Sequence, residues 1–176
     1  MINVALVGLR ASGKSTVASL LAPSLELVPV DTDALVADRF PEATVADIWR
    51  KHGESAWRTV EVEVASSVLA ELGQVVSMGG GMPIVPAVFD AMRREQEADR
   101  LMVAYLDVAP EILESRMQSD LGDRPGLHGD SPVAEIGRVH EERDPVYRSL
   151  ADVVCVVGGE EAAHDTAARL LAMLVD

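Results

Sequence analysis

The sequence has almost none of the residues that cross-link a small protein. Its 176 residues include one cysteine, Cys155, so the chain cannot form an internal disulfide. The four histidines, at 52, 128, 140 and 164, lack the spacing of a zinc site. We therefore expect a fold held together by its hydrophobic core, with Cys155 buried in the apolar run 153–157.

Positive charge and long apolar runs are also scarce. Lysine and arginine number 15 against 29 aspartates and glutamates, a net charge of −14. Such a chain repels nucleic acid and anionic membranes, and no apolar run is long enough to cross a bilayer. No basic segment precedes the apolar run at residue 2, so we expect no secretory signal and a cytoplasmic protein. Any anion site must be built locally from a few arginines.

Strand and helix patterns alternate along the chain, which is typical of an α/β fold with a parallel sheet. The length fits one domain, residues 1–176. Short apolar runs predict strands at 2–7, 27–30, 74–78, 101–106 and 153–157. Helical periodicity and capping residues predict helices at 15–21, from about 33, at 45–52, 55–72, from 86, 110–117, from 131 to about 145, and 160–174. Glycine, proline and charged residues predict a loop at 119–130.

A phosphate-binding motif lies between the first strand and the first helix. Residues 8–15 match G-x-x-x-x-G-K-[ST], and the strand, glycine turn and helix start together aim backbone N–H groups at an anion such as ATP. Lys14 would reach the β- and γ-phosphates, and the Ser15 hydroxyl would bind Mg²⁺.

Two further strands end in residues suited to catalysis at the same sheet edge. Asp31 and Asp33 follow the second strand, and we expect one to hold water on the metal while the other faces the acceptor hydroxyl. An Asx turn in which Asp33 caps the next helix is the alternative. Three glycines, 79 to 81, follow the third strand and let backbone approach a ligand closely.

Three arginines are candidates for the anion site. Arg58 lies on the long predicted helix, with Glu61 three residues later, so a surface ion pair is an alternative. Arg124 lies in the glycine-rich loop, which resembles a hinged lid that carries a cation over the phosphates. Arg143 precedes Pro145, where we expect a helix to break.

The whole chain resembles the shikimate kinase family. The resemblance rests on the phosphate loop, on Asp31-Thr32-Asp33, on the G-E-x-x-x-R-x-x-E segment from Gly53 to Glu61, on the triple glycine, and on Arg124-Pro125 and R-x-P-x-Y from Arg143 to Tyr147. Order and spacing both agree.

The resemblance implies a P-loop kinase of the nucleoside monophosphate kinase type, with a five-stranded parallel sheet and helices on both faces. It implies shikimate as acceptor, ATP as co-substrate, Mg²⁺ as cofactor and a monomeric enzyme. The region 33–61 would bind the substrate, and the loop 119–130 would form the lid. The implied ATP-binding residues are Arg10, Ala11, Ser12, Gly13, Lys14, Ser15, Thr16, Arg116 and Arg124; the shikimate-binding residues are Asp33, Arg58, Gly79, Gly80, Gly81 and Arg143; the metal-binding residues are Ser15 and Asp31; and the catalytic residues are Lys14, Asp33 and Arg124.

The chain departs from the family pattern at a few positions. Ala11 stands where a second loop glycine is usual, and Trp49 and Trp57 stand where phenylalanines are usual. The function that the resemblance implies is phosphorylation of the 3-hydroxyl of shikimate. The alternatives are another small P-loop kinase, acting on gluconate or a nucleoside monophosphate, and a nucleotide-binding module without turnover.

Overall fold

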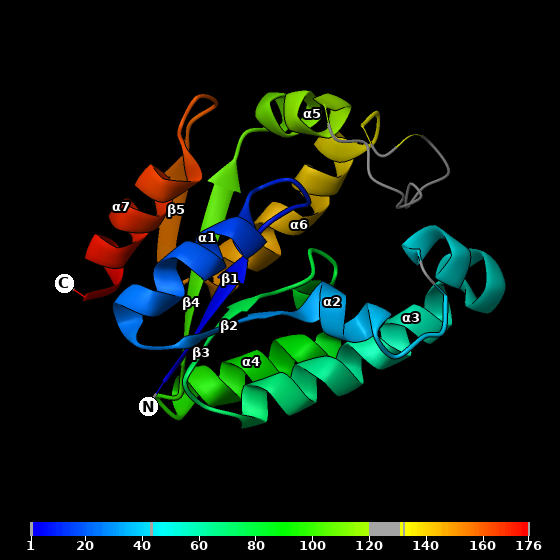
Figure 1. Ribbon diagram of the computed structural model, residues 1–176, viewed down its shortest axis with the longest axis horizontal. Helices are drawn as coiled ribbons and strands as arrows, with labels where there is room; N and C mark the ends of the chain where they lie inside the picture. Colours follow the sequence, from blue (N-terminus) through cyan, green and yellow to red (C-terminus); the bar gives the residue numbers. More distant parts are fainter. Residues whose placement is uncertain (1, 43, 120–130, 132, 176) are drawn as a thin grey trace.

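The computed structural model describes residues 2–42, 44–119, 131 and 133–175. Within these ranges the strands form one five-stranded parallel sheet in the order β2-β3-β1-β4-β5 (Figure 1). The predicted α/β fold is confirmed. The strands are β1 (Asn3–Val7), β2 (Val28–Asp31), β3 (Gln74–Ser77), β4 (Leu101–Val108) and β5 (Val153–Val157).

Helices cover both faces of the sheet. On one face α1 packs against α7, and on the other α4 packs against α3 and α6 (Figure 1). None of the helices in the described ranges combines the length and apolarity needed to cross a bilayer. The helices are α1 (Lys14–Leu21), α2 (Thr32–Ala37), α3 (Val45–Ala70), α4 (Pro86–Glu97), α5 (Pro110–Ser119), α6 (Ile136–Leu150) and α7 (Ala163–Val175), with short 3₁₀ turns η1 (Ala22–Leu25) and η2 (Met82–Ile84).

The central strand β1 positions the phosphate loop. All five of its residues are buried, as expected of a parallel strand covered on both faces. Its parallel register places Leu6 beside Ser77 of β3, which in turn lies beside Asp31 of β2. The carboxyl ends of these three strands therefore meet at one edge, where the segments that follow them form a common site.

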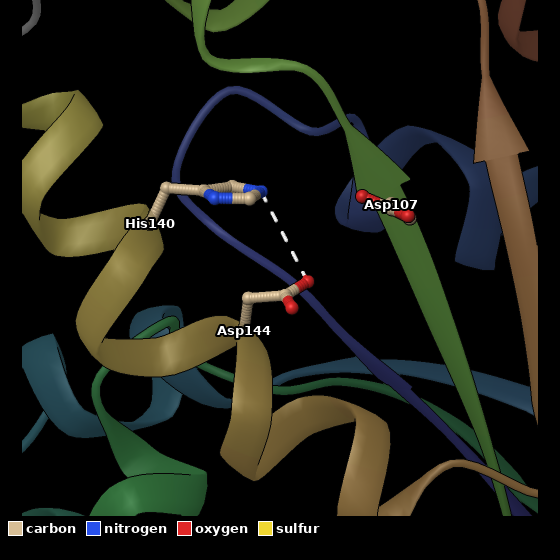
Figure 2. A group of neighbouring side chains, drawn as sticks. All are labelled: Asp107, His140 and Asp144. Atoms are coloured by element: carbon tan, nitrogen blue, oxygen red, sulfur yellow. Dashed lines mark ion pairs between the residues drawn. The ribbon is translucent and has the colours of Figure 1, made fainter.

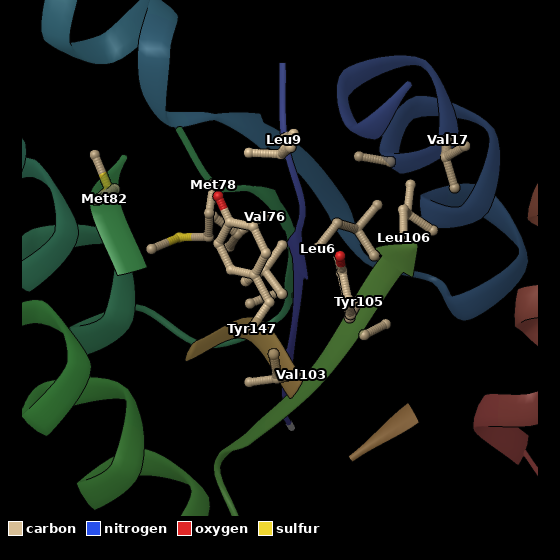
Figure 3. Close-up of a cluster of buried hydrophobic side chains, with 14 of the residues drawn as sticks. Leu6, Leu9, Val17, Val76, Met78, Met82, Val103, Tyr105, Leu106 and Tyr147 are labelled. Atoms are coloured by element: carbon tan, nitrogen blue, oxygen red, sulfur yellow. The ribbon is translucent and has the colours of Figure 1, made fainter. Parts of the chain in front are cut away.

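The core continues beneath that edge. Figure 3 shows Tyr105 of β4 and Tyr147 of α6 among aliphatic side chains of the central strands, and their ring centroids lie 5.2 Å apart. Cys155 is 1% exposed, and burial raises the pKa of its thiol. The prediction of a buried, structural cysteine is confirmed.

Helix α3 contains a kink at the predicted break. Gly53 has φ 79° and ψ 167°, so residues 45–52 and 54–70 form two helical arms joined at a non-helical residue. Thr44 caps the first arm, since its hydroxyl accepts a hydrogen bond of 3.1 Å from the backbone N–H of Asp47. The second arm ends at Ala70, slightly before the predicted Leu72.

The predicted bounds of α6 were wrong at both ends. We expected a helix from Ser131 that ends near Pro145, but α6 begins at Ile136 and continues through Pro145 to Leu150. Proline lacks a backbone donor and disfavours a helix interior. The helix continues because Tyr147 and Leu150, in its last turns, are both completely buried. Ser131 instead caps a single turn, where its hydroxyl accepts a 3.2 Å hydrogen bond from the N–H of Ala134.

Candidate active site

The phosphate loop joins β1 to α1 through two glycines with positive φ. Gly8 has φ 148° and Gly13 has φ 92°, which side chains rarely allow. A Cβ at Gly8 would lie 2.9 Å from the carbonyl oxygen of Leu106, so β4 also requires glycine there. No side chain caps the first turn of α1, where an anion finds backbone N–H donors and the positive end of the helix dipole.

Lys14 folds back over this loop. Its ammonium group donates to the carbonyl of Leu9 at 2.8 Å and to the Ser12 hydroxyl at 3.3 Å. The residue is 8% exposed, yet its side chain borders the cavity described below. The positive charge is thus held at the loop, where it can contact a phosphate oxygen.

Ser15, Asp31 and Ser77 form a cluster of oxygen atoms beside the loop. The Ser15 hydroxyl donates to the Asp31 carboxylate and lies 3.1 Å from the Ser77 hydroxyl. Hydroxyl and carboxylate oxygens are the hard ligands that Mg²⁺ prefers. The residues expected to bind the metal therefore fit it chemically, and Ser77 is a neighbour that the motif did not predict.

Asp31 and Asp33 have different roles. The Asp31 carboxylate caps α2 by accepting from the N–H of Asp33 at 2.9 Å and of Ala34 at 3.3 Å. The alternative in which Asp33 is the cap is wrong, because Asp31 occupies the N-cap position and Asp33 lies inside the helix. Asp33 lies in the first turn of α2 and borders the cavity.

The triple glycine makes room for the charged side chains around it. A Cβ at Gly79 would lie 2.5 Å from Oδ1 of Asp33, and one at Gly81 would overlap the guanidinium of Arg58. A Cβ at Gly80 would lie 3.7 Å from the guanidinium of Arg143. None of the three has positive φ. At Gly79 and Gly81 a side chain would displace a charged group, whereas at Gly80 the tightest contact would be the carbonyl oxygen of Gly8, at 3.3 Å.

Arg58 pairs with a buried carboxylate inside the cavity. Its Nη1 lies 2.7 Å from Oε2 of Glu61, and its Nη2 lies 3.0 Å from Oε1 of Glu54. Burial acts to lower the pKa of Arg58, but the charges and hydrogen bonds of Glu61 and Glu54 outweigh it, so the pKa is raised. Glu61 is 2% exposed. The ion pair considered as an alternative exists, but it is not on the surface, and it orients Arg58 along the cavity wall.

Arg143 is buried on the facing helix, α6. It is 8% exposed and interacts with Tyr147, whose hydroxyl donates to the carbonyl of Gly80. Burial raises the pKa of Tyr147 to about 12, although the positive charge of Arg143 opposes the shift. Because Tyr147 ties α6 to the glycine run, Arg143 is fixed against the same cavity as Arg58.

A second group of charges attaches α6 to β4. Figure 2 shows His140 and Asp144 of α6 facing Asp107 of β4. Arg148 donates to Asp107 at 2.6 Å and to Asp144 at 2.8 Å, and the Tyr105 hydroxyl donates to Asp144 at 2.9 Å. A guanidinium thus already neutralises both carboxylates. We interpret this group as an ionic support for α6.

The structure describes some of the other residues that we expect to contact the nucleotide. Arg116 on α5 donates to the carbonyl of Ala11 at 3.2 Å, which places its guanidinium beside the phosphate loop. Ala11 itself has φ 63°, a left-handed conformation that costs a non-glycine residue about 1–2 kcal/mol. Stacking of Arg116 on adenine stays a prediction. Arg124 and residues 120–130 of the predicted lid lie outside the described residues.

One cavity of about 440 Å³ brings these groups together. Most of the predicted residues border it, and others that border it were not predicted as site residues. The predicted residues are Arg10, Ala11, Gly13, Lys14, Ser15, Thr16, Asp33, Arg58, Gly80, Gly81 and Arg143, and the additional ones include Trp49, Trp57, Glu61, Ser77 and Glu135. Of the additional residues, Ser77 could have been predicted from the sequence, because it is a polar residue at the end of an apolar strand, just before the glycine run.

The chain is similar to shikimate kinases along nearly its whole length. The family model described as shikimate kinase matches residues 10–174. The shikimate kinase of Synechococcus sp. is 36% identical over 172 residues, 98% of this chain and 84% of the relative. That of Symbiobacterium thermophilum is 35% identical over 174 residues, 98% of this chain and 95% of the relative.

Solved structures agree with this assignment. Shikimate kinase from Acinetobacter baumannii in complex with shikimate superposes with a TM-score of 0.87 at 28% identity, covering 99% of this chain and 93% of that one. Deoxyadenosine kinase from M. mycoides, with a TM-score of 0.58 at 14% identity over 99% of this chain and 100% of its own, shares the fold alone. Family match, sequence identity and fold lead to one conclusion: the chain belongs to the shikimate kinase family.

Proposed function

We propose that this chain transfers the γ-phosphoryl group of ATP to the 3-hydroxyl of shikimate, forming shikimate 3-phosphate for chorismate and aromatic amino acid synthesis. One observation carries the proposal. The phosphate loop and the Arg58–Arg143 pair border the same cavity, so a triphosphate and a small carboxylic acid can meet in it. Membership of the shikimate kinase family supports the same reaction.

The donor side of the cavity would hold Mg·ATP. Backbone N–H groups of residues 10–16 would surround the phosphates, and Lys14 would exchange its contact with the Leu9 carbonyl for a phosphate oxygen. Ser15 and Asp31 would bind Mg²⁺, directly or through water. The ion, when bound, would supply positive charge that offsets the negative charge of the phosphates. Arg124 and Arg116 complete the proposed nucleotide site.

The acceptor side would hold shikimate by its carboxylate. Arg58 and Arg143 offer planar guanidinium groups suited to bidentate contacts with a carboxylate. The glycine run 79–81 leaves room for the side chains of Asp33 and Arg58 beside the cavity. Asp33 would then face the hydroxyls.

Catalysis in this site would depend on positioning and electrostatics. Asp33 would orient the attacking hydroxyl and accept its proton. Lys14 and Arg124 would stabilise the negative charge on the transferring phosphoryl group, a contribution of about 3–4 kcal/mol for a comparable electrostatic group. Closure of the segment 119–130 would exclude water and suppress ATP hydrolysis.

A coupled assay of ADP release tests the reaction and separates it from its rivals. We expect ADP release with shikimate, and none above background with gluconate or CMP. Lys14→Met is the matched control and should reduce turnover at least a hundredfold. Release with gluconate or CMP instead would assign another small-molecule kinase, and ATP binding without any acceptor-dependent release would assign a nucleotide-binding module.

The proposed active unit is a monomer. Both walls of the cavity come from one chain, so the proposed reaction requires no second copy. Light scattering during gel filtration should give a mass near 18.8 kDa.

A further inference from the structure

Trp49 holds a polar group at the cavity that the proposed mechanism does not use. It lies on the first arm of α3, four residues before the kink at Gly53, and borders the same cavity as Arg58 and Arg143. Trp57, on the second arm, also borders the cavity and stacks on Phe40 with a ring-centroid distance of 6.1 Å. The two tryptophans therefore belong to the acceptor side.

The indole N–H of Trp49 is a buried donor with no acceptor among the described residues. Its Nε1 atom exposes less than 1 Å². Buried polar groups in folded proteins are almost always hydrogen-bonded, so each exception requires an explanation. An indole nitrogen can only donate. The missing partner must therefore be an oxygen-bearing group that the described residues do not supply.

We infer that Trp49 is a specificity-determining residue that donates its indole N–H to an oxygen of the bound acceptor. The inference rests on the proposed function, because shikimate is the molecule that brings such oxygens to this side of the cavity. Its carboxylate and three hydroxyls are all acceptors. A phenylalanine would place a smaller aromatic ring here without a donor, so the N–H adds selection for an oxygen at this point.

The kink at Gly53 makes this contact accessible. The backbone dihedral angles of Gly53 are not helical, so the arm 45–52 can turn slightly against the arm that carries Arg58. Because Nε1 is covered in the structure, the acceptor reaches it only after such an adjustment of the arm or a rotation of the ring. The donor then gains its partner when substrate binds, and the buried N–H has a functional explanation.

Trp49→Phe tests the inference because it removes the N–H and keeps an aromatic ring. Losing one hydrogen bond should raise KM for shikimate about five- to tenfold, with a smaller change in kcat and none in KM for ATP. The melting temperature should fall only by the packing that the smaller ring loses, because the N–H has no hydrogen bond to lose among the described residues. Unchanged KM for shikimate would overturn the inference, as would an equal rise in KM for ATP.

Gln74→Met is the matched control. Gln74 also has a buried side-chain oxygen without a hydrogen-bond partner in the described ranges, but it lies at the amino end of β3, opposite the cavity. Its substitution should leave both KM values unchanged. A parallel rise in KM for shikimate would show that any buried polar group has this effect and would contradict the assignment.

NMR of the unsubstituted protein gives an answer even if Trp49→Phe does not fold. The two tryptophans give two indole N–H resonances, and the one that remains in Trp57→Phe is that of Trp49. Adding shikimate without ATP should move this resonance downfield and slow its exchange with water. A resonance that stays in place while shikimate saturates the protein would overturn the inference. Absence of shikimate turnover in the unsubstituted enzyme would instead contradict the proposed function.

Discussion

Glu61 holds the guanidinium of Arg58 at 2.7 Å from one helical turn away, and the carboxylate is buried while the guanidinium reaches the cavity. The pair fixes the direction in which Arg58 points. A carboxylic acid that enters the cavity therefore meets a preoriented cation, which reduces the entropy lost on binding.

Glu61→Gln should weaken substrate binding more than it slows turnover. The amide can still accept one hydrogen bond from Arg58 but no longer fixes it by charge, so KM for shikimate should rise about three- to tenfold, and stability should fall by about 1–2 kcal/mol. Steady-state kinetics and urea unfolding measure the two effects. Glu54→Gln is the control, because Glu54 binds the same guanidinium from a half-exposed position. Equal effects from both variants would contradict a special role for the buried partner.

Arg143→Ala and Arg58→Ala should each raise KM for shikimate about 10–100-fold, because each removes a charge-assisted contact with the carboxylate. Arg124→Ala should chiefly lower kcat, since its proposed contact forms with the transferring group. Initial-rate kinetics with both substrates varied separate the two patterns. An unchanged KM for shikimate in both Arg58→Ala and Arg143→Ala would contradict the carboxylate grip.

Gly81→Ala should impair shikimate binding more than it lowers the stability of the protein. The new methyl group would overlap the Arg58 guanidinium, which can move because it ends a flexible side chain. We expect KM for shikimate to rise at least about tenfold, as for loss of a charged hydrogen bond, while stability falls by about 1–2 kcal/mol because the displaced guanidinium also pairs with Glu61. Gly137→Ala, in open space on α6, is the control and should leave KM unchanged. A severe loss of stability in Gly81→Ala would contradict this explanation.

Ala11→Gly should stabilise the protein by about 0.5–1.5 kcal/mol, because glycine adopts the positive φ of this residue without strain. Removing the methyl group beside the phosphates should also lower KM for ATP modestly, about two- to threefold, roughly 0.5 kcal/mol. Glu26→Gly, at a positive φ of 56° outside the cavity, should give a similar gain in stability and no change in KM. Thermal unfolding and kinetics check both points. No gain in stability from Ala11→Gly would show that the loop conformation is not strained.

Tyr147→Phe should weaken the dependence of stability on alkaline pH. Burial raises the pKa of Tyr147 to about 12 from the ordinary tyrosine value of 10.0, so the unfolded chain releases this proton first. The stabilisation is complete below pH 10 and is lost as pH rises through 12, at about 1.4 kcal/mol per pH unit. Urea unfolding between pH 9 and 11.5 should show a shallower loss in the variant. At neutral pH the variant should lose about 1 kcal/mol with its hydrogen bond to Gly80. If the free energy of unfolding fell equally with pH in the two proteins, the raised pKa of Tyr147 would be contradicted.

Local sequence patterns were sufficient to predict much of the candidate site. The phosphate loop was recognisable because strand, glycine turn and helix are consecutive in the chain, and the Thr44 cap and Gly53 break are effects of single residues. The sequence did not reveal that α6 continues through Pro145. Proline disfavours a helix interior locally, whereas burial of Tyr147 and Leu150 is decided by distant strands. The same reason explains why Tyr147 was not predicted as the residue that ties α6 to Gly80.

The amino-acid sequence alone determined the α/β class, the site of phosphate binding and the residue types available for an acidic acceptor, because each depends on neighbours a few positions apart. Only the tertiary structure decided which of Asp31 and Asp33 caps a helix, that Glu61 is buried against Arg58, and that Trp49 keeps an unpaired donor among the described residues. Burial and hydrogen-bond partners arise when segments far apart in the chain pack together, and no local pattern specifies which atoms will then be left without water or a partner.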